Sequence, residues 1–132
     1  MIKKYSDMSQ EEVDEFIGER VPKGSFVYEI GCGGKSSVTF GKMWKSGLIG
    51  SYLGCNFDSD AVDEAREQGL TARLVAKDFN PKIILESLKK CGKEIAVLAM
   101  FGLLEKAPEV AKNYAKQARD LEIKNIVSYP EI

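Results

Sequence analysis

Short runs of apolar and β-branched residues alternate along this chain with longer stretches in which apolar residues recur every three or four positions. The short runs are typical of buried strands, and the longer stretches are typical of helices with one apolar face. Strands are predicted at residues 25–30, 51–57, 71–75, 95–100 and 125–129. Helices are predicted at residues 9–21, 35–45, 58–69, 80–92 and 107–121.

Local signals mark where several of these helices begin. Ser9 and Glu12 have the spacing of a capping box, in which each side chain accepts a hydrogen bond from the other residue's backbone. Asp58 is predicted to cap the third helix, because its carboxylate can accept from the free N–H groups of the first turn. Pro81 is predicted at the first helical position of the fourth helix, where its missing N–H costs nothing.

The alternation of strands and helices also predicts a topology. Because a helix joins each strand to the next, the strands must run parallel and the crossovers must be right-handed. We therefore expect an α/β fold with a doubly wound, mainly parallel five-stranded sheet, helices on both faces and a Rossmann-like strand order 3-2-1-4-5. A chain of 132 residues is long enough for one such domain, spanning residues 1–132.

Composition narrows the classes of partner. Nineteen basic residues and 20 acidic residues leave a net charge of -1, so no overall field attracts nucleic acid or anionic lipid. The longest nearly apolar run, residues 95–104, is too short to cross a bilayer, and residues 1–10 lack the apolar stretch of a signal peptide. We expect a cytoplasmic protein that does not associate with membranes.

The cysteine and histidine counts limit the chemistry further. The three cysteines are widely spaced and form no CxxC pair, which indicates reduced thiols rather than a disulfide framework. There is no histidine, so the commonest general base and the usual Cys/His zinc sites are absent from the sequence. A transition metal held by this chain is not expected.

A glycine-rich turn follows the first predicted strand, in the sequence Glu29-Ile30-Gly31-Cys32-Gly33-Gly34. Without side chains at this turn, we expect backbone N–H groups to face a ligand at the positive end of the next helix. Asn56 and Asp58 follow about 20 residues later, the spacing at which a polar side chain receives ribose hydroxyls in nucleotide-binding sheets. The sequence therefore predicts a ligand site at this end of the sheet.

Residues 27–79 resemble the S-adenosylmethionine-dependent methyltransferases of the Rossmann-like class. Residues 29–33 (EIGCG) are similar to the family's first motif, an acidic residue followed by glycines, and residues 54–62 (GCNFDSDAV) are similar to the end of its second strand. Residues 75–79 (VAKDF) are similar to the tip of its third strand. Residues 95–104 have the character of the fourth strand and its loop, where the family places the methyl acceptor.

The resemblance implies S-adenosylmethionine as cofactor and assigns its contacts. The glycine turn would hold the methionine end of the cofactor, and Asn56 or Asp58 would receive the ribose. Asp78 with Phe79 would lie beside the adenine. Glu29 would either orient the turn or accept a hydrogen bond from the cofactor. The full set of expected cofactor contacts is Glu29, Gly31, Cys32, Gly33, Asn56, Phe57, Asp58, Asp78 and Phe79.

Three departures from the family pattern limit what is expected. Lys35 stands where many members of the family have a third glycine. Asn56 stands where the family usually has an acid, and the sequence stops after the fifth strand, where the family sheet normally continues. We therefore expect an S-adenosylmethionine-binding protein shortened at its C-terminus, either a minimal methyltransferase or a binding module that relies on a partner. The acceptor and any catalytic residue are not indicated, and Glu105 is the carboxylate that follows the fourth strand.

A P-loop nucleotide-binding protein is the first alternative. Gly33-Gly34-Lys35-Ser36 lies between a predicted strand and a predicted helix, as the end of a P-loop does. The P-loop pattern requires its first glycine where Glu29 stands, and a carboxylate there would repel phosphate. This reading predicts magnesium-dependent ATP binding.

A non-catalytic Rossmann-like assembly module is the second alternative. The fifth strand would lie at an edge of the sheet, where unpaired backbone groups invite pairing with another chain. The apolar character of residues 126–132 favours such a contact. We expect a homodimer, or a complex with a partner subunit, through this edge.

Overall fold

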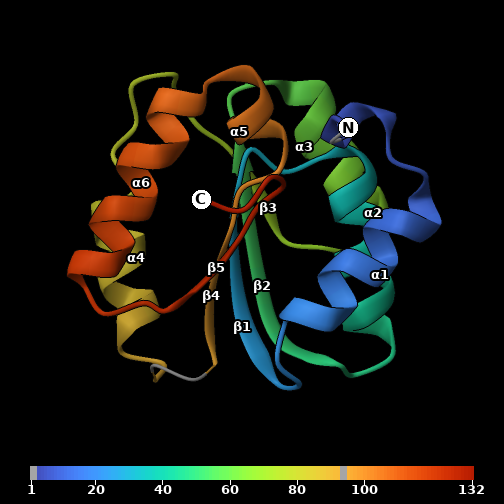
Figure 1. The fold of residues 1–132 in the computed structure, drawn as a ribbon, viewed down its shortest axis with the longest axis horizontal. Coiled ribbons are helices and arrows are strands. Elements are labelled where there is room, and N and C mark those ends of the chain that lie inside the picture. The colour runs from blue at the N-terminus through green and yellow to red at the C-terminus, as the bar shows by residue number, and fades with distance from the viewer. Residues whose placement is uncertain (1–2, 93–94) are drawn as a thin grey trace.

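Five parallel strands form a single sheet in the computed structural model, which describes residues 3–92 and 95–132 (Figure 1). The strands are β1 (Ser25–Ile30), β2 (Ile49–Asn56), β3 (Ala72–Leu74), β4 (Ala96–Ala99) and β5 (Asn125–Val127). They lie in the order β3-β2-β1-β4-β5, and every pairing is parallel. This confirms the predicted fold class and strand order.

Helices cover both faces of this sheet (Figure 1). One face carries α1 (Gln10–Arg20), α2 (Gly34–Lys45) and α3 (Ser59–Glu67), and the other carries α4 (Lys82–Lys89) and α6 (Pro108–Asp120). A short helix α5 (Gly102–Lys106) follows β4, and a 3-10 turn η1 (Tyr5–Asp7) precedes α1. Among the described residues, no helix is both long enough and apolar enough to span a bilayer.

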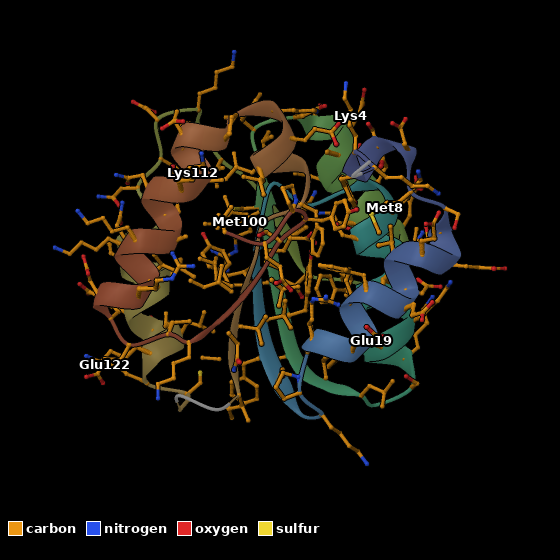
Figure 2. The ribbon with its side chains drawn as sticks, viewed as in Figure 1. Lys4, Met8, Glu19, Met100, Lys112 and Glu122 are labelled. Carbon is orange, nitrogen blue, oxygen red and sulfur yellow. The ribbon has the colours of Figure 1, made fainter. Side chains whose placement is uncertain are left out.

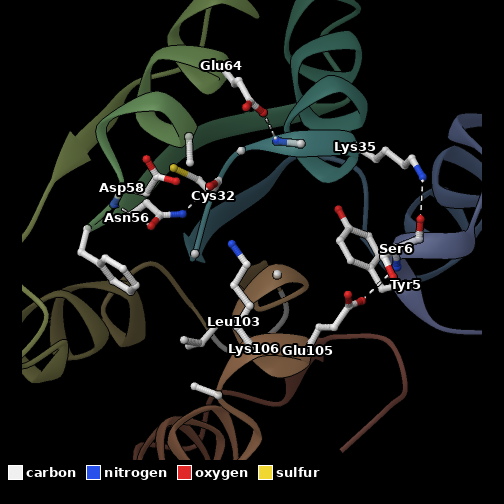
Figure 3. A pocket seen from close by; sticks show the side chains of 17 residues that line it. Tyr5, Ser6, Cys32, Lys35, Asn56, Asp58, Glu64, Leu103, Glu105 and Lys106 are labelled. Atoms are coloured by element: carbon white, nitrogen blue, oxygen red, sulfur yellow. Dashed lines mark hydrogen bonds between the residues drawn. The ribbon is translucent and has the colours of Figure 1, made fainter.

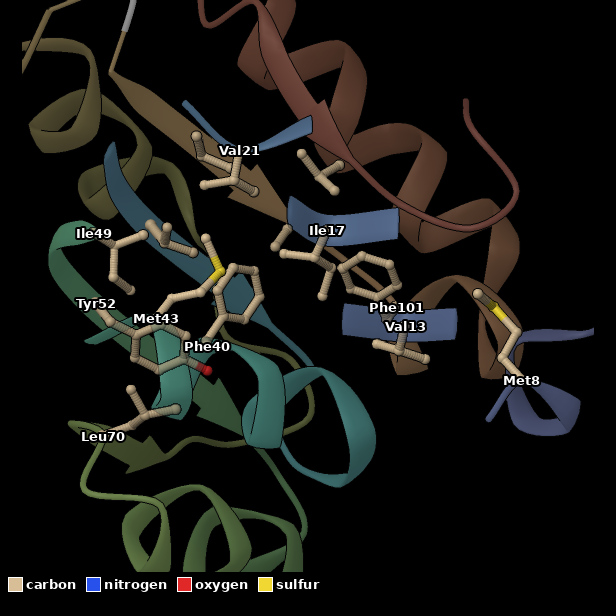
Figure 4. Close-up of a cluster of buried hydrophobic side chains, with 14 residues drawn as sticks. Met8, Val13, Ile17, Val21, Phe40, Met43, Ile49, Tyr52, Leu70 and Phe101 are labelled. Carbon is tan, nitrogen blue, oxygen red and sulfur yellow. The ribbon is translucent and has the colours of Figure 1, made fainter. Parts of the chain in front are cut away.

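Each face of the sheet has its own core because alternate side chains of a strand point to opposite faces. Along β1, Val27 joins the cluster that includes Phe40 of α2 (Figure 4). The next residue, Tyr28, joins the cluster beneath α4 and α6. Met100 is fully buried at the centre, whereas Lys112 of α6 points outward (Figure 2). The sheet is therefore covered on both sides, as its apolar strands require.

The predicted helix starts are confirmed for α1 and α3. Ser9 and Glu12 form the complete capping box, and Asp58 caps α3 by accepting from the N–H of Asp60. The predicted first position of α4 is off by one, because Pro81 precedes the helix and Lys82 is its first residue. Neither η1 nor α5 was predicted, since three or five residues are too few to display a helical period.

The segment after β5 folds back onto the domain. Tyr129 packs edge-to-face on Phe16 of α1, with 5.2 Å between ring centroids. On the other face, the backbone carbonyl of Ile132 accepts a hydrogen bond from Arg119 of α6, and the Ile132 side chain packs against the core there. Some of the apolar side chains of residues 126–132 thus have partners within the chain, and a dimer through this edge stays a prediction.

Two glycines inside helices provide a matched test of the packing between α2 and α3. A Cβ at Gly18 of α1 would meet nothing within 4 Å, whereas one at Gly41 of α2 would lie 2.8 Å from Cβ and 3.0 Å from the backbone oxygen of Gln68. Gly18→Ala should raise the free energy of unfolding by about 0.5–1 kcal/mol, because alanine is the better helix former. Gly41→Ala should lower it by about 1–3 kcal/mol through overpacking. Urea denaturation measures both changes, and stabilisation by both variants would contradict the close approach of Gly41 to Gln68.

Candidate functional site

A cavity of about 530 Å³ opens at the carboxyl ends of β1, β2 and β4 (Figure 3). Its walls are the turn at residues 31–35, residues 56–58, the start of α3, one side of α5 and residues 5–6. The chain leaves β1 toward β2 on one side and reaches β4 on the other, so the cavity lies at the topological switch point of the sheet. Ligands bind at this position in doubly wound folds.

The structure brings most of the predicted cofactor contacts together. Those that line the cavity are Gly31, Cys32, Gly33, Asn56, Phe57 and Asp58. Glu29, Asp78 and Phe79 do not line it. Asp78 is exposed at the tip beyond β3, and Phe79 packs on Tyr114 of α6 with 6.3 Å between ring centroids. Residues 78 and 79, which the resemblance places beside the adenine, therefore lie outside the cavity.

The glycine turn is wedged between two helices. Gly31 and Gly33 have φ values of +84° and +111°, which residues with a side chain rarely adopt. A Cβ at Gly33 would lie 2.8 Å from Cβ of Ala61 in α3, and a Cβ at Gly31 would lie 3.0 Å from the backbone nitrogen of Leu103 in α5. Glycine is thus required here for packing as well as for backbone conformation.

Four N–H groups of this turn, at residues 31–34, are not bare as expected, because each has a partner within the chain. Gly33 N–H donates to the hydroxyl of Ser37 at 2.7 Å, and Gly34 N–H donates to the Glu64 carboxylate at 2.8 Å. The N–H groups of Gly31 and Cys32 both donate to the Cys55 carbonyl. The chain satisfies these donors itself, because a buried N–H without a partner is costly.

Asn56 joins the two loops that form one wall of the cavity. Its amide nitrogen donates to the Cys32 carbonyl at 2.8 Å, and its amide oxygen accepts from the N–H of Asp58 at 3.0 Å. An ionised aspartate has no donor for the Cys32 carbonyl, which explains why an amide suits this position. Asp58 uses one carboxylate oxygen to accept from the N–H of Asp60 at 3.0 Å, and the other oxygen has no hydrogen bond to the described residues.

Glu29 lies behind the turn rather than in the cavity. Its fully buried carboxylate accepts hydrogen bonds from the Tyr52 hydroxyl of β2, at 2.5 Å, and from the Ser36 hydroxyl of α2. Burial raises the pKa of this carboxyl from 4.5 to about 7, although both hydrogen bonds favour the charged form. Glu29 thus connects the first turn of α2 to the sheet.

Tyr5, which the sequence leaves open as either an ordinary surface residue or a lid over the site, forms an N-terminal wall of the cavity together with Ser6. The Tyr5 hydroxyl accepts from the N–H of Ser36 at 2.9 Å, and the Tyr5 ring packs on Phe101 with 5.3 Å between centroids. The N–H of Ser6 donates to the Glu105 carboxylate at 2.9 Å. These contacts link η1 to α2 and α5 across about 30 and 100 residues of chain, and no local pattern signals them.

Helix α5 contributes a side chain that no sequence pattern indicated. Lys106 lines the cavity, and its ammonium group points into it (Figure 3). The sequence pattern continued the apolar run of β4 as far as Leu104 and so contained no helix at this point. Without α5, nothing indicated that Lys106 faces the glycine turn.

Comparisons with known proteins give no match. No family model matches the chain, and no curated protein is significantly similar to it. The family resemblance described above therefore remains a proposal. Within the described part of the chain, no group of three or more Asp, Glu, Cys or His residues is arranged to hold a metal ion.

The buried Glu29 carboxyl should make stability depend on pH. Its pKa is higher in the folded protein, about 7, than the ordinary 4.5, so the folded state binds the proton more tightly. This contribution is complete below pH 4.5 and is lost as the pH rises to about 7. The free energy of unfolding should fall by roughly 2–3 kcal/mol between about pH 5 and about pH 8.

Glu29→Gln serves as the matched variant, because the amide has the shape of the carboxyl and does not ionise. Its free energy of unfolding, measured by urea denaturation, should change much less over the same pH range. An equal slope in both proteins would show that other groups cause the pH dependence.

Proposed function

We propose that the cavity binds S-adenosylmethionine and that the protein is a small methyltransferase or a cofactor-binding module of that fold. The main support for the proposal is that the glycine turn after β1 and the polar residues 56–58 at the end of β2 line the same wall of one cavity. Its volume, about 530 Å³, lies within the range of small-molecule sites. The resemblance of residues 27–79 to the family supports the same ligand.

The polar groups on this wall suit the parts of the cofactor. The Gly34 N–H already holds a carboxylate, that of Glu64, so it can hold the methionine carboxylate in exchange. The unshared oxygen of Asp58 is an acceptor for a ribose hydroxyl. The ring of Phe57 lines the cavity with 52% of the residue exposed and offers an apolar surface to adenine. Asp58 replaces Asn56 in the ribose role, because both ends of the Asn56 amide are occupied.

When bound, S-adenosylmethionine supplies a methyl group on an electrophilic sulfonium. The contribution of this chain would be to bind the cofactor and hold it against a second reactant, since positioning is the main requirement of a direct displacement. The glycine turn and α3 lie on one side of the cavity and α5 lies across from them (Figure 3). A second reactant would enter between the cofactor and α5.

Two contacts count against the P-loop alternative. The Lys35 ammonium donates to the backbone carbonyls of Ser6, at 3.2 Å, and Met8, rather than pointing into the cavity. The Ser36 hydroxyl donates to the buried Glu29 carboxylate. In a P-loop, the corresponding lysine and serine bind phosphate and magnesium. Magnesium-dependent ATP binding without S-adenosylmethionine binding would reverse this choice.

Asp58→Asn tests the ribose contact without removing the helix cap, because asparagine caps helices as well as aspartate does. We expect this variant to bind S-adenosylhomocysteine about tenfold more weakly, since it loses a hydrogen bond to a charged acceptor. Isothermal titration calorimetry measures the change. Asp63→Asn, on an exposed position of α3 away from the cavity, is the control and should bind as the wild type does. Equal affinity of all three proteins would remove Asp58 from the site.

Glu64→Ala tests whether this side chain occupies the place of the ligand carboxylate. The variant frees the Gly34 N–H, so S-adenosylhomocysteine should bind roughly threefold more tightly, a modest gain because the Glu64 contact is exposed. 5′-Methylthioadenosine has the same adenosyl thioether without the amino-acid part, and its affinity should not change. A similar change for both ligands, or a loss for S-adenosylhomocysteine, would place the methionine carboxylate elsewhere.

A further inference from the structure

The charged side chains on the cavity wall are not equivalent. The Lys35 ammonium donates hydrogen bonds to the backbone carbonyls of Ser6 and Met8. The Glu64 carboxylate accepts from the Gly34 N–H, and the Glu105 carboxylate accepts from the Ser6 N–H. Asp58 caps α3. Lys106 is the charged residue of this wall that has no hydrogen bond or ion pair to the described residues. Every other charge helps to hold the wall together, whereas Lys106 is available to a ligand.

The residues around Lys106 indicate the charge and polarity of a ligand that would suit this site. Leu103, one helical turn earlier, and Ala107 line the cavity on the same side, so the Lys106 side chain rises from an apolar surface and its ammonium points toward the glycine turn (Figure 3). A single ammonium with apolar neighbours matches a single carboxylate on an apolar body. A phosphate would require several donors. The Gly33 N–H already donates to Ser37, and the proposed function gives the Gly34 N–H to the cofactor carboxylate.

We propose that the α5 side of the cavity binds a second small molecule, an apolar carboxylic acid in its ionised form, through Lys106. This inference rests on the proposed function, which gives the cofactor carboxylate to the Gly34 N–H on the opposite wall. The resulting arrangement is electrostatically consistent. A bound sulfonium would share its cavity with the Lys106 ammonium, and a carboxylate between them neutralises part of that repulsion. Lys106 is thus a specificity-determining residue for the second reactant.

Benzoate and benzamide are matched probes for this site, because they have nearly the same shape and differ in charge. In ¹H–¹⁵N NMR titrations at constant ionic strength, benzoate should bind the wild-type protein about fivefold more tightly than benzamide, as expected for one partly exposed ion pair. The perturbed signals should include Gly102 and Leu103. Lys106→Met should abolish the preference for benzoate, and Lys116→Met, on an exposed position of α6, should keep it. Equal binding of the two probes, or a preference that survives Lys106→Met, would overturn the proposal.

Titrations with saturating nucleoside ligands identify the source of the carboxylate. The preference for benzoate should persist in the presence of S-adenosylhomocysteine and of 5′-methylthioadenosine, and Lys106→Met should leave the affinity for S-adenosylhomocysteine unchanged within about twofold. If S-adenosylhomocysteine abolishes the preference and 5′-methylthioadenosine does not, Lys106 serves the cofactor carboxylate and the proposal fails. If neither nucleoside binds, the proposed function fails. The comparison of benzoate with benzamide still decides whether Lys106 binds a carboxylate.

Discussion

The close packing of the glycine turn between α3 and α5 is the constraint on which this site depends. Gly31 approaches Leu103 and Gly33 approaches Ala61 so closely that a methyl group at either position would displace backbone. The positive φ values at both residues turn the chain away from β1 at this point. The turn therefore sets the distance between the two helices and, with it, the space left for a ligand at the end of the sheet.

Polar atoms around the turn are shared among elements that are distant in sequence. Glu29 on β1 holds Ser36 of α2 and Tyr52 of β2, while Asn56 ties the end of β2 to the turn. Glu64 reaches from α3 to the first N–H of α2. These bonds stabilise the wall without a ligand, so binding exchanges some of them for ligand contacts. The affinity for a ligand then depends on the difference in free energy between the ligand's contacts and the internal hydrogen bonds that it replaces.

The two sides of the cavity have different chemistry. The side formed by the glycine turn and α3 presents donors and acceptors that suit an amino acid and a sugar, most of them already occupied within the chain. The α5 side presents an apolar surface and the ammonium of Lys106, which has no ion pair to the described residues. The proposed transfer of a methyl group would bring together two ligands of different character, and the two sides of the cavity differ in the same way.

The order of elements and the place of the cavity beside the first turn were predictable from the sequence alone. Strand periodicity, the capping residues Ser9 and Asp58, and the glycines after β1 act through near neighbours in the chain, so they are readable without coordinates. Tertiary structure decided which polar atoms remain available to a ligand. Asn56 is occupied, residues 78 and 79 lie outside the cavity, and Lys106 points into it. These outcomes depend on contacts between segments 24 to 99 residues apart, which are set by how the helices pack on the sheet and leave no local pattern in the sequence.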